Sequence, residues 1–264
     1  MNLGLRGKLA VVSGSTAGIG FAIAAVLAQE GARVVINGRT EARVTTAVEK
    51  IRQRMKGAEL IGVAADLGTA AGVNAFVKQI PEADILVNNL GIFEAKPFLE
   101  IPDADWLRFF EINVLSGVRL TRHYLAGMLE KNWGRVIFIS SESGQQIPTE
   151  MIHYGMTKTA QVAIARGVAQ TVVATGVTVN SVLVGPTASE GASEFVQNMA
   201  RQQAISAAEV EKQFFATIRP TSLLKRFETP EEIAAVVAFV ASTQSVAING
   251  AAVRAEAGVV QSIF

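Results

Sequence analysis

Short runs of apolar, β-branched residues alternate along this chain with longer stretches of helix-like composition, and this alternation constrains the fold more than any other feature. It predicts parallel strands joined by helical crossovers. We expect seven strands, at Leu9–Val12, Val34–Asn37, Leu60–Ala64, Ile85–Val87, Val136–Ser140, Val177–Leu183 and Ala251–Ala255. Continuous apolar runs such as residues 136–139 are typical of a parallel sheet covered by helices on both faces. The pattern therefore predicts a doubly wound α/β fold.

The chain of 264 residues has no composition break that would mark a domain boundary. A length of this order suits one α/β domain, so we expect a single domain over residues 1–264. The stretch from about 187 to 227, between the sixth and seventh strands, is rich in Ala, Gln and Ser. We interpret it as a helical lid over the substrate.

The composition argues against several classes of protein. The net charge is +1 and the basic residues are scattered, which disfavours nucleic acid or an anionic membrane as partner. There are no cysteines and only two histidines, so we expect neither disulfides nor a metal site. Neither a signal peptide nor a membrane-spanning run is evident, and we expect a cytoplasmic protein. The mean hydropathy of +0.33 is high for such a protein and suggests apolar surface buried between subunits.

A glycine-rich turn follows the first strand and opens an Ala-rich helix at Phe21–Gln29. Glycines here let the backbone turn sharply and approach a pyrophosphate, whose charge is favoured by the N–H groups at a helix N-terminus. The alternative is a turn of this kind with no ligand. The expected cofactor contacts in the turn are Gly14, Ser15, Thr16, Gly18, Ile19 and Gly20.

Gly38 and Arg39 follow the second strand, where a site that prefers NAD would usually have an acidic residue. A guanidinium can bind the 2′-phosphate of NADP with charge-assisted hydrogen bonds, so we expect NADP(H) to be preferred over NAD(H). A solvated loop arginine is the alternative. After the third strand, Asp66 could bind the adenine amino group with Leu67 supplying a backbone contact, or Asp66 could cap the following helix.

Tyr154 and Lys158 are four residues apart, and Ser141 lies thirteen residues before the tyrosine. In a helix the two side chains share a face, so the ammonium can lower the pKa of the phenol and make it a proton donor for a carbonyl. Taken alone, the spacing also fits an ordinary amphipathic pair.

Residues 13–20 and 88–91 together with Asn113, Ser141, Tyr154 and Lys158 resemble the short-chain dehydrogenase/reductase superfamily, in its branch of about 250 residues. The likeness extends over essentially the whole chain and includes members such as 3-oxoacyl and carbonyl reductases. It implies a Rossmann-type domain with a seven-stranded parallel sheet, commonly assembled as a homotetramer.

The resemblance also implies a role for each residue of the tetrad. Tyr154 would exchange a proton with the substrate oxygen while the nicotinamide exchanges hydride with carbon. Lys158 would hold the nicotinamide ribose and favour the tyrosinate, and Ser141 would orient the substrate oxygen. Asn113 would hold a water that links Lys158 to solvent, although a helix asparagine bonded to nearby backbone is the alternative.

The remaining cofactor contacts implied by the resemblance are Asn89, Gly91, Gly185, Thr187 and Ser189, with a structural role for Asn88. Three places depart from the usual pattern. Leu90 replaces an alanine beside the cofactor, Val184 replaces a proline after the sixth strand, and residues 254–258 replace an Asp-Gly-Gly ending.

The substrate pocket is less well defined by the sequence. The candidates for its lining are Phe93, Glu94, Glu142, Gln145, Gln146, His153, Thr187 and residues 195–199. We expect His153 at the rim of the pocket, and Glu142 is either a specificity group or solvated.

We favour a ketone and secondary alcohol oxidoreductase acting on a small free ketone. Reduction of a 3-oxoacyl thioester is the alternative, but basic residues that could receive an acidic carrier are few. A dinucleotide-binding sensor without turnover is a further possibility.

Two helices are expected to mediate assembly. The helix at Thr157–Thr175 is apolar around most of its circumference and must be buried on more than its sheet side. With the long helix expected at Asp105–Lys131, it predicts an isologous dimer interface and a tetramer.

Overall fold

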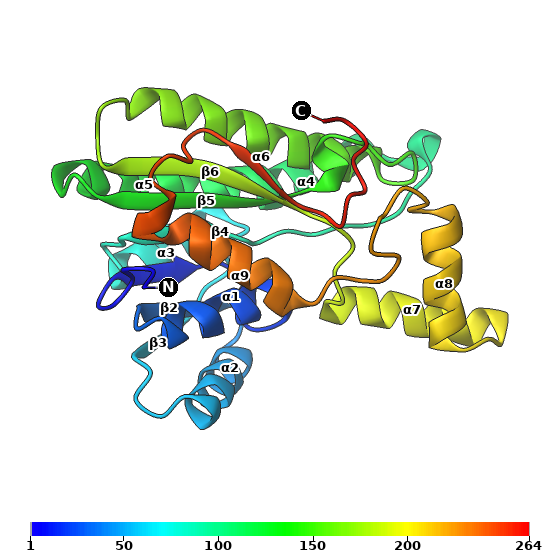
Figure 1. Ribbon diagram of the computed structural model, residues 1–264, viewed down its shortest axis with the longest axis horizontal. Helices are drawn as coiled ribbons and strands as arrows, with labels where there is room; N and C mark the ends of the chain where they lie inside the picture. The colour runs from blue at the N-terminus through cyan, green and yellow to red at the C-terminus, as the bar shows by residue number, and fades with distance from the viewer. Residues whose placement is uncertain (1, 264) are drawn as a thin grey trace.

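The computed structural model describes residues 2–263, except for the side chains of Ala192, Glu194 and Phe195. The expected pocket role of Phe195 therefore lies outside the described residues. One parallel sheet of seven strands has the order β3-β2-β1-β4-β5-β6-β7 (Figure 1). The strands are β1 Leu9–Val12, β2 Arg33–Gly38, β3 Leu60–Ala64, β4 Ile85–Asn88, β5 Gly134–Ser141, β6 Val177–Val184 and β7 Ala252–Ala255. All seven expected strands are confirmed, with ends that differ by at most two residues.

Helices cover both faces of the sheet, as the continuous apolar strands predicted (Figure 1). One face is covered by α1 Gly18–Gln29, α2 Glu41–Arg54 and α9 Pro230–Ala241, and the other by α3 Ala70–Gln79, α5 Ser116–Glu130 and α6 Ile152–Thr171. The order of strands reverses direction between β1 and β4. In a doubly wound sheet, ligands bind at the carboxyl ends of the strands beside this switch point.

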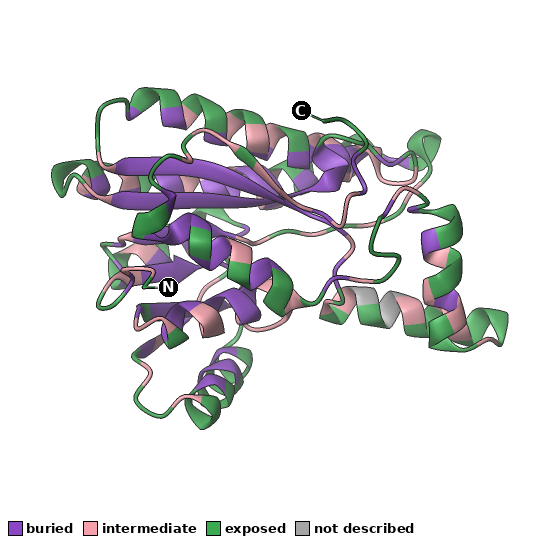
Figure 2. Ribbon diagram, in the orientation of Figure 1, coloured by how far each residue is buried: buried purple, intermediate pink, exposed green. Residues whose placement is uncertain are grey.

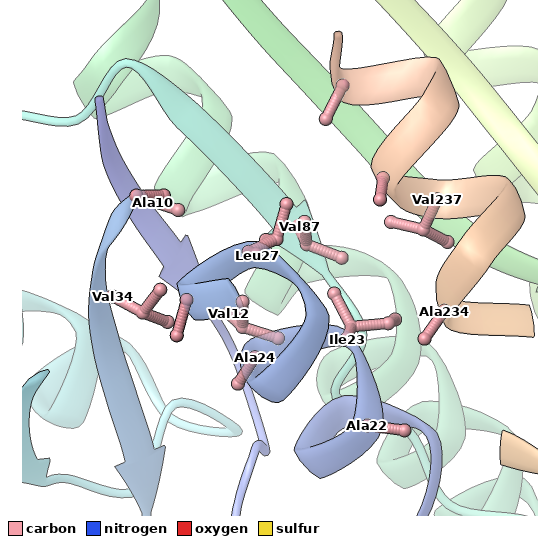
Figure 3. Close-up of a cluster of buried hydrophobic side chains, with 14 of the residues drawn as sticks. Ala10, Val12, Ala22, Ile23, Ala24, Leu27, Val34, Val87, Ala234 and Val237 are labelled. Carbon is pink, nitrogen blue, oxygen red and sulfur yellow. The ribbon is translucent and has the colours of Figure 1, made fainter. Parts of the chain in front are cut away.

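Successive residues of each strand divide between two apolar cores because their side chains point to opposite faces of the sheet. In β1, Val12 belongs to the core under α1 and α9, whereas Val11 belongs to the core under α3, α5 and α6. Figure 3 shows the first core, in which Ile23 and Leu27 of α1 lie beside Val237 of α9 and the strand residues. These two cores fix the positions of the carboxyl ends of the strands.

The long helix expected at Asp105–Lys131 is interrupted. An α-helix at Asp103–Phe110, α4, continues into a π-helical turn at Glu111–Leu115 and then into α5. Widened turns of this kind are frequently found at functional sites, and this one contains Asn113.

The helix expected at Thr157–Thr175 is also placed differently, because α6 begins at Ile152 and ends at Thr171. Val172 leaves helical geometry, and Ala174 has a φ of 61°, which ends the helix before Gly176. Tyr154 therefore lies within the first turn of α6.

The segment expected to form a lid, called the lid below, contains α7 Glu190–Gln203 and α8 Ala207–Thr217, which extend away from the sheet (Figure 1). Most of its described residues are exposed or half-buried, in contrast to the buried strands (Figure 2). The expected helical insertion is thus present. Among the described residues, no helix has both the length and the apolar character needed to cross a membrane.

Candidate active site

The glycine turn between β1 and α1 has the backbone geometry that the sequence predicted. Gly14 and Gly18 have φ values of 62° and 55°, which residues with a side chain rarely adopt. A Cβ on Gly20 would lie 2.5 Å from the carbonyl oxygen of Gly14, so no side chain fits there. Helix α1 begins at Gly18 without a side-chain cap from Ala17. Its first N–H groups thus remain available to an anion.

Two asparagines hold this turn in place. Asn37, at the end of β2, accepts a hydrogen bond from the N–H of Gly14 at 3.1 Å and donates to Ala65 O at 3.1 Å. Asn89 donates its side-chain amide to Ser13 O at 2.9 Å and to Gly14 O at 3.1 Å. Asn89 was an expected site residue. Asn37 was missed, although its place at the end of a strand beside the turn was a usable signal.

The other residues that follow β4 support these contacts. Asn88 is buried and donates to Thr121 Oγ1 at 3.1 Å, which agrees with the structural role expected for it. The Leu90 side chain packs against Gly14, at 3.4 Å from the position that a Cβ there would take. The leucine at residue 90, which replaces the usual alanine, therefore fills space beside the glycine turn. Gly91 lies next to both Asn113 and Lys158.

An open cleft of about 490 Å³ lies between the glycine turn and α2. It is lined by Thr16, Ala17, Gly18, Phe21, Ala42, Arg43, Thr46, Lys50 and Glu190. Gly38 packs directly against Thr16 at its edge, and Arg39 is exposed at the end of β2.

Arg43, which the sequence analysis did not select, lines the cleft, and its Nη2 lies 2.6 Å from Glu190 Oε2. Arg43 and Lys50 are seven residues apart and share one face of α2. This spacing in the sequence was the signal that could have identified Arg43 as a residue of the cleft.

Asp66 does not cap helix α3. Its carboxylate accepts from the N–H of Gly68 at 3.1 Å, and the N-cap is Thr69, whose hydroxyl accepts from Gly72 N at 3.0 Å. The capping alternative for Asp66 is therefore wrong, because the helix starts three residues later than that role requires. Leu67 is buried in the core.

The loop after β6 is fixed by a buried carboxylate. The N–H of Gly185 donates to Glu228 Oε2 at 3.0 Å, and Thr187 Oγ1 donates to Gly185 O at 2.9 Å. Burial raises the pKa of Glu228 to about 7. Ser189 Cβ lies 3.4 Å from the position that a Cβ on Gly18 would take, which joins this loop to the glycine turn. Glu228 was missed by the sequence analysis.

Ser141 ends β5, and Tyr154 and Lys158 lie on the first turns of α6, which packs on β5 and β6. The Nζ of Lys158 is 5.5 Å from the centre of the Tyr154 ring. The Ser141 hydroxyl donates to the Glu142 carboxylate, and Ser141 lies close enough to the Tyr154 phenol to favour its ionised form. The three expected residues are thus brought close together.

The electrostatics differ from the expectation. Burial, reinforced by the charge of Glu142, raises the pKa of Tyr154, whereas we expected Lys158 to lower it. Burial also lowers the pKa of Lys158, to about 8. Removal from water disfavours both charged forms here. A phenol that keeps its proton is able to donate it.

Gln161 connects Lys158 to Asn113. Its Oε1 accepts from Lys158 Nζ at 3.3 Å, and its Nε2 donates to the backbone carbonyl of Asn113 at 2.6 Å. The Asn113 side chain bonds the backbone of Ile92 and the hydroxyl of Thr157.

The backbone carbonyl of Asn113 therefore has a protein partner in Gln161, and the water expected at Asn113 stays a prediction. The sequence analysis missed Gln161. It follows Lys158 by three residues and Tyr154 by seven, which places all three on one face of α6.

A buried ion pair lies beside Ser141. Glu142 is 4% exposed, and its Oε1 accepts from Arg219 Nε at 3.0 Å, while its Oε2 accepts from the Ser141 hydroxyl. Arg219 follows α8 at the end of the lid and also donates to Glu150 at 3.0 Å. Of the two interpretations of Glu142, the solvated one is wrong, because an arginine 77 residues away covers it.

His153 is not at the rim of the pocket. It is 0% exposed, and its ring centre lies 4.1 Å from that of Phe109 and 6.0 Å from that of Trp106. Burial lowers its pKa. The expectation failed because α4 packs against this side of α6, which the sequence does not reveal.

A nicotinamide dinucleotide fits the residues of this crevice. The positive-φ glycines and the uncapped N-terminus of α1 would accommodate the pyrophosphate. The Arg43 cleft would take the adenosine end, and the role of Lys158 at the nicotinamide ribose stays a prediction.

Comparisons with known proteins agree over the whole chain. A model of the short chain dehydrogenase family matches residues 8–200. The uncharacterized oxidoreductase YvaG of Bacillus subtilis (strain 168) is 49% identical over 264 residues, with 100% of both chains covered. The 3-oxoacyl-acyl-carrier-protein reductase FabG of Aquifex aeolicus (strain VF5) is 30% identical, with 98% of this chain and 99% of the relative covered. L-sorbose reductase from Gluconobacter frateurii, solved with NADPH and L-sorbose, is 28% identical, has a TM-score of 0.94 and is covered over 100% of both chains.

Proposed function

The chain belongs to the short-chain dehydrogenase/reductase family, and on that premise we propose that it is an NADP(H)-dependent oxidoreductase that interconverts a ketone and a secondary alcohol. The observation that carries the proposal is the convergence of Ser141, Tyr154 and Lys158 at the carboxyl end of β5. These side chains can bind a carbonyl oxygen and give it a proton.

Each residue has a defined task in reduction. Tyr154 donates its phenolic proton to the substrate oxygen, and Ser141 donates a second hydrogen bond that orients the same oxygen. Lys158 places a positive charge beside the phenol and binds the ribose hydroxyls. NADPH, when bound, would supply the hydride that reduces the carbonyl carbon. In the oxidation direction, Tyr154 accepts the proton of the alcohol.

The preference for NADP(H) is supported by basic residues at the adenosine end. Arg39 follows β2 directly, and Arg43 and Lys50 line the adjacent cleft. A 2′-phosphate binds well to guanidinium groups. L-sorbose reductase, a relative solved with NADPH, supports the same choice.

We further propose that the substrate is a small free ketone. L-sorbose reductase, whose structure contains a ketose, matches this chain over its full length. Reduction of a 3-oxoacyl thioester is the second candidate, which the 30% identity to the acyl-carrier-protein reductase favours. A sensor that binds the dinucleotide without turnover is the candidate from another class.

The deciding experiment is a panel of free ketones and 3-oxoacyl thioesters, assayed with NADPH and NADH side by side. We expect NADPH-dependent reduction of free ketones by the wild type. Tyr154→Phe removes the proton donor, so turnover should fall by about 10²- to 10⁴-fold. Full activity in Tyr154→Phe would contradict the mechanism, and cofactor binding without any turnover would favour the sensor.

Assembly and location are also proposals. We propose that copies associate through α4, α5 and α6 into at least a dimer, and a tetramer by a second interface. Leu107 and Phe110 of α4, together with Val173 after α6, are exposed apolar residues that support this. Equilibrium sedimentation tests it, with a monomer as the contradicting result. The cytoplasmic location remains a prediction of the sequence.

A further inference from the structure

The hydroxyl of Ser141 has a single hydrogen, and the structure assigns that hydrogen to Glu142 Oε2. The serine oxygen itself accepts from the N–H of Ser143 at 3.1 Å. In the proposed reaction, Ser141 must donate the same hydrogen to the carbonyl oxygen of the substrate. Binding of a ketone therefore takes the hydrogen away from Glu142.

The carboxylate of Glu142 has few other donors to replace it. Glu142 is 4% exposed, so water has little access, and its other oxygen already accepts from Arg219 Nε at 3.0 Å. Arg219 is itself 8% exposed and donates in addition to Glu150 and to the backbone of Ile218. A ketone with no hydroxyl would leave Glu142 Oε2 buried without a donor, which is costly for a charged group.

A substrate with a hydroxyl on the carbon next to the carbonyl removes this cost. In such a substrate, the hydroxyl oxygen lies within hydrogen-bonding distance of the carbonyl oxygen. Glu142 Oε2 is likewise within hydrogen-bonding distance of Ser141 Oγ. When Ser141 turns to the carbonyl oxygen, the substrate hydroxyl can donate to Glu142. A carboxylate accepts hydrogen bonds and does not donate them, so it selects a donor at this position.

We propose that Glu142, held by Arg219, is a specificity-determining residue that selects α-hydroxy ketones over ketones without a hydroxyl. The inference rests on the proposed function, because it assigns Ser141 to the substrate oxygen. It adds a substrate class and a residue that recognises it. Sites that hydrogen-bond a substrate hydroxyl discriminate strongly against analogues that lack it.

Three ketones of similar size test the inference with NADPH. Hydroxyacetone has the donor, butanone has a methyl in place of the hydroxyl, and methoxyacetone keeps the electron-withdrawing oxygen but cannot donate. For the wild type we expect kcat/KM for hydroxyacetone to exceed that for each of the other two by about 10- to 100-fold. The methoxy compound separates hydrogen bonding from intrinsic reactivity.

Two variants assign the preference to Glu142. Glu142→Met combined with Arg219→Met removes the carboxylate and its buried partner together, which avoids an unpaired charge. The preference should fall to about twofold or less, mainly because butanone and methoxyacetone become better substrates. Glu150→Gln is the matched control, since it removes the other carboxylate partner of Arg219 and leaves the Ser141 contact intact. It should keep the wild-type preference.

The outcomes separate the inference from the proposed function. Reduction of all three ketones with similar kcat/KM by the wild type would overturn the inference and leave the function standing. An equal loss of preference in Glu150→Gln would also overturn it, because the effect would then not depend on Glu142. The absence of turnover with any ketone would reject the proposed function and the inference with it.

Discussion

The two sides of the active-site crevice are held by different kinds of contact. On the cofactor side, the glycine turn is fixed by backbone conformation and by Asn37 and Asn89, which bond its backbone atoms. On the side of the proposed substrate, the lid is joined to Ser141 through the Glu142–Arg219 ion pair. The glycine turn is buried or half-buried, whereas most described residues of the lid are exposed or half-buried (Figure 2).

This difference indicates where each side is sensitive to change. Backbone contacts tolerate most side-chain substitutions nearby but not the loss of a glycine. The contact of the lid with Ser141, in contrast, depends on the individual side chains Glu142 and Arg219.

The largest effect is expected at the buried ion pair. Arg219→Met leaves the Glu142 carboxylate buried without its cation, which should lower the free energy of unfolding by about 3–5 kcal/mol. Urea denaturation monitored by circular dichroism measures the change. The double variant Glu142→Met/Arg219→Met should recover most of it.

The matched control is Arg226→Met, which breaks the exposed pair with Glu232 and should cost less than about 1 kcal/mol. If the Arg219 and Arg226 variants were equally stable, the lid would not depend on the buried pair, and the proposed difference between the two sides would disappear.

The next effect is expected at the glycine turn. Gly20→Ala places a methyl group 2.4 Å from Asn89 Nδ2 and 2.5 Å from Gly14 O, so the turn must move. We expect the dissociation constant for NADPH, measured by fluorescence titration, to rise by about 10- to 100-fold. Gly127→Ala on α5 is the control, because its added methyl meets nothing within 4 Å. Unchanged NADPH affinity in Gly20→Ala would contradict the close packing of the turn.

A smaller effect is expected at Gln161, which hydrogen-bonds both Lys158 and the backbone of Asn113. The pKa of Lys158 is about 8, so the ammonium is lost above that pH and kcat/KM for reduction should fall there. Gln161→Leu removes an acceptor that stabilises the ammonium, which lowers the pKa of Lys158 and moves the fall to lower pH. Gln161→Glu adds a negative charge and should move it to higher pH, each by about one unit.

A pH profile of kcat/KM distinguishes these directions from a general loss of stability. Gln170→Leu, on the exposed side of the same helix, should leave the profile unchanged. Shifts of the two Gln161 variants in the same direction would show that Gln161 does not act on the charge of Lys158.

The smallest effect is expected at the edge of the adenosine cleft. The Arg43 side chain is 54% exposed, so its attraction for a 2′-phosphate is screened by water. Arg43→Ala should reduce the ratio of kcat/KM with NADPH to that with NADH by about fivefold, and Arg39→Ala by a similar factor. Arg52→Ala, on the same helix but outside the cleft, is the control. An unchanged ratio in both cleft variants would refute the basis for the NADP(H) preference.

The sequence predicted the parts of the fold that depend on local patterns. Strands such as β1 and β3 were assigned with their exact bounds, because continuous apolar runs between turn residues are a local signal. The predicted bounds of helix α6 and of the interrupted helix around Asn113 were less accurate. Their ends depend on the conformation of Ala174 and on a π-helical turn, and neither has a local sequence signal.

In the candidate site, too, features with a local sequence signal were predicted and long-range contacts were not. The sequence by itself determined the glycine turn, the proximity of Tyr154 to Lys158 and the place of Ser141, because each depends on strand ends or helical periodicity. Only the tertiary structure decided that Glu142 is paired with Arg219, that His153 is buried and that Gln161 bridges Lys158 to Asn113. These contacts join residues up to 77 positions apart, and the packing of separate elements, which no local pattern encodes, brings them together.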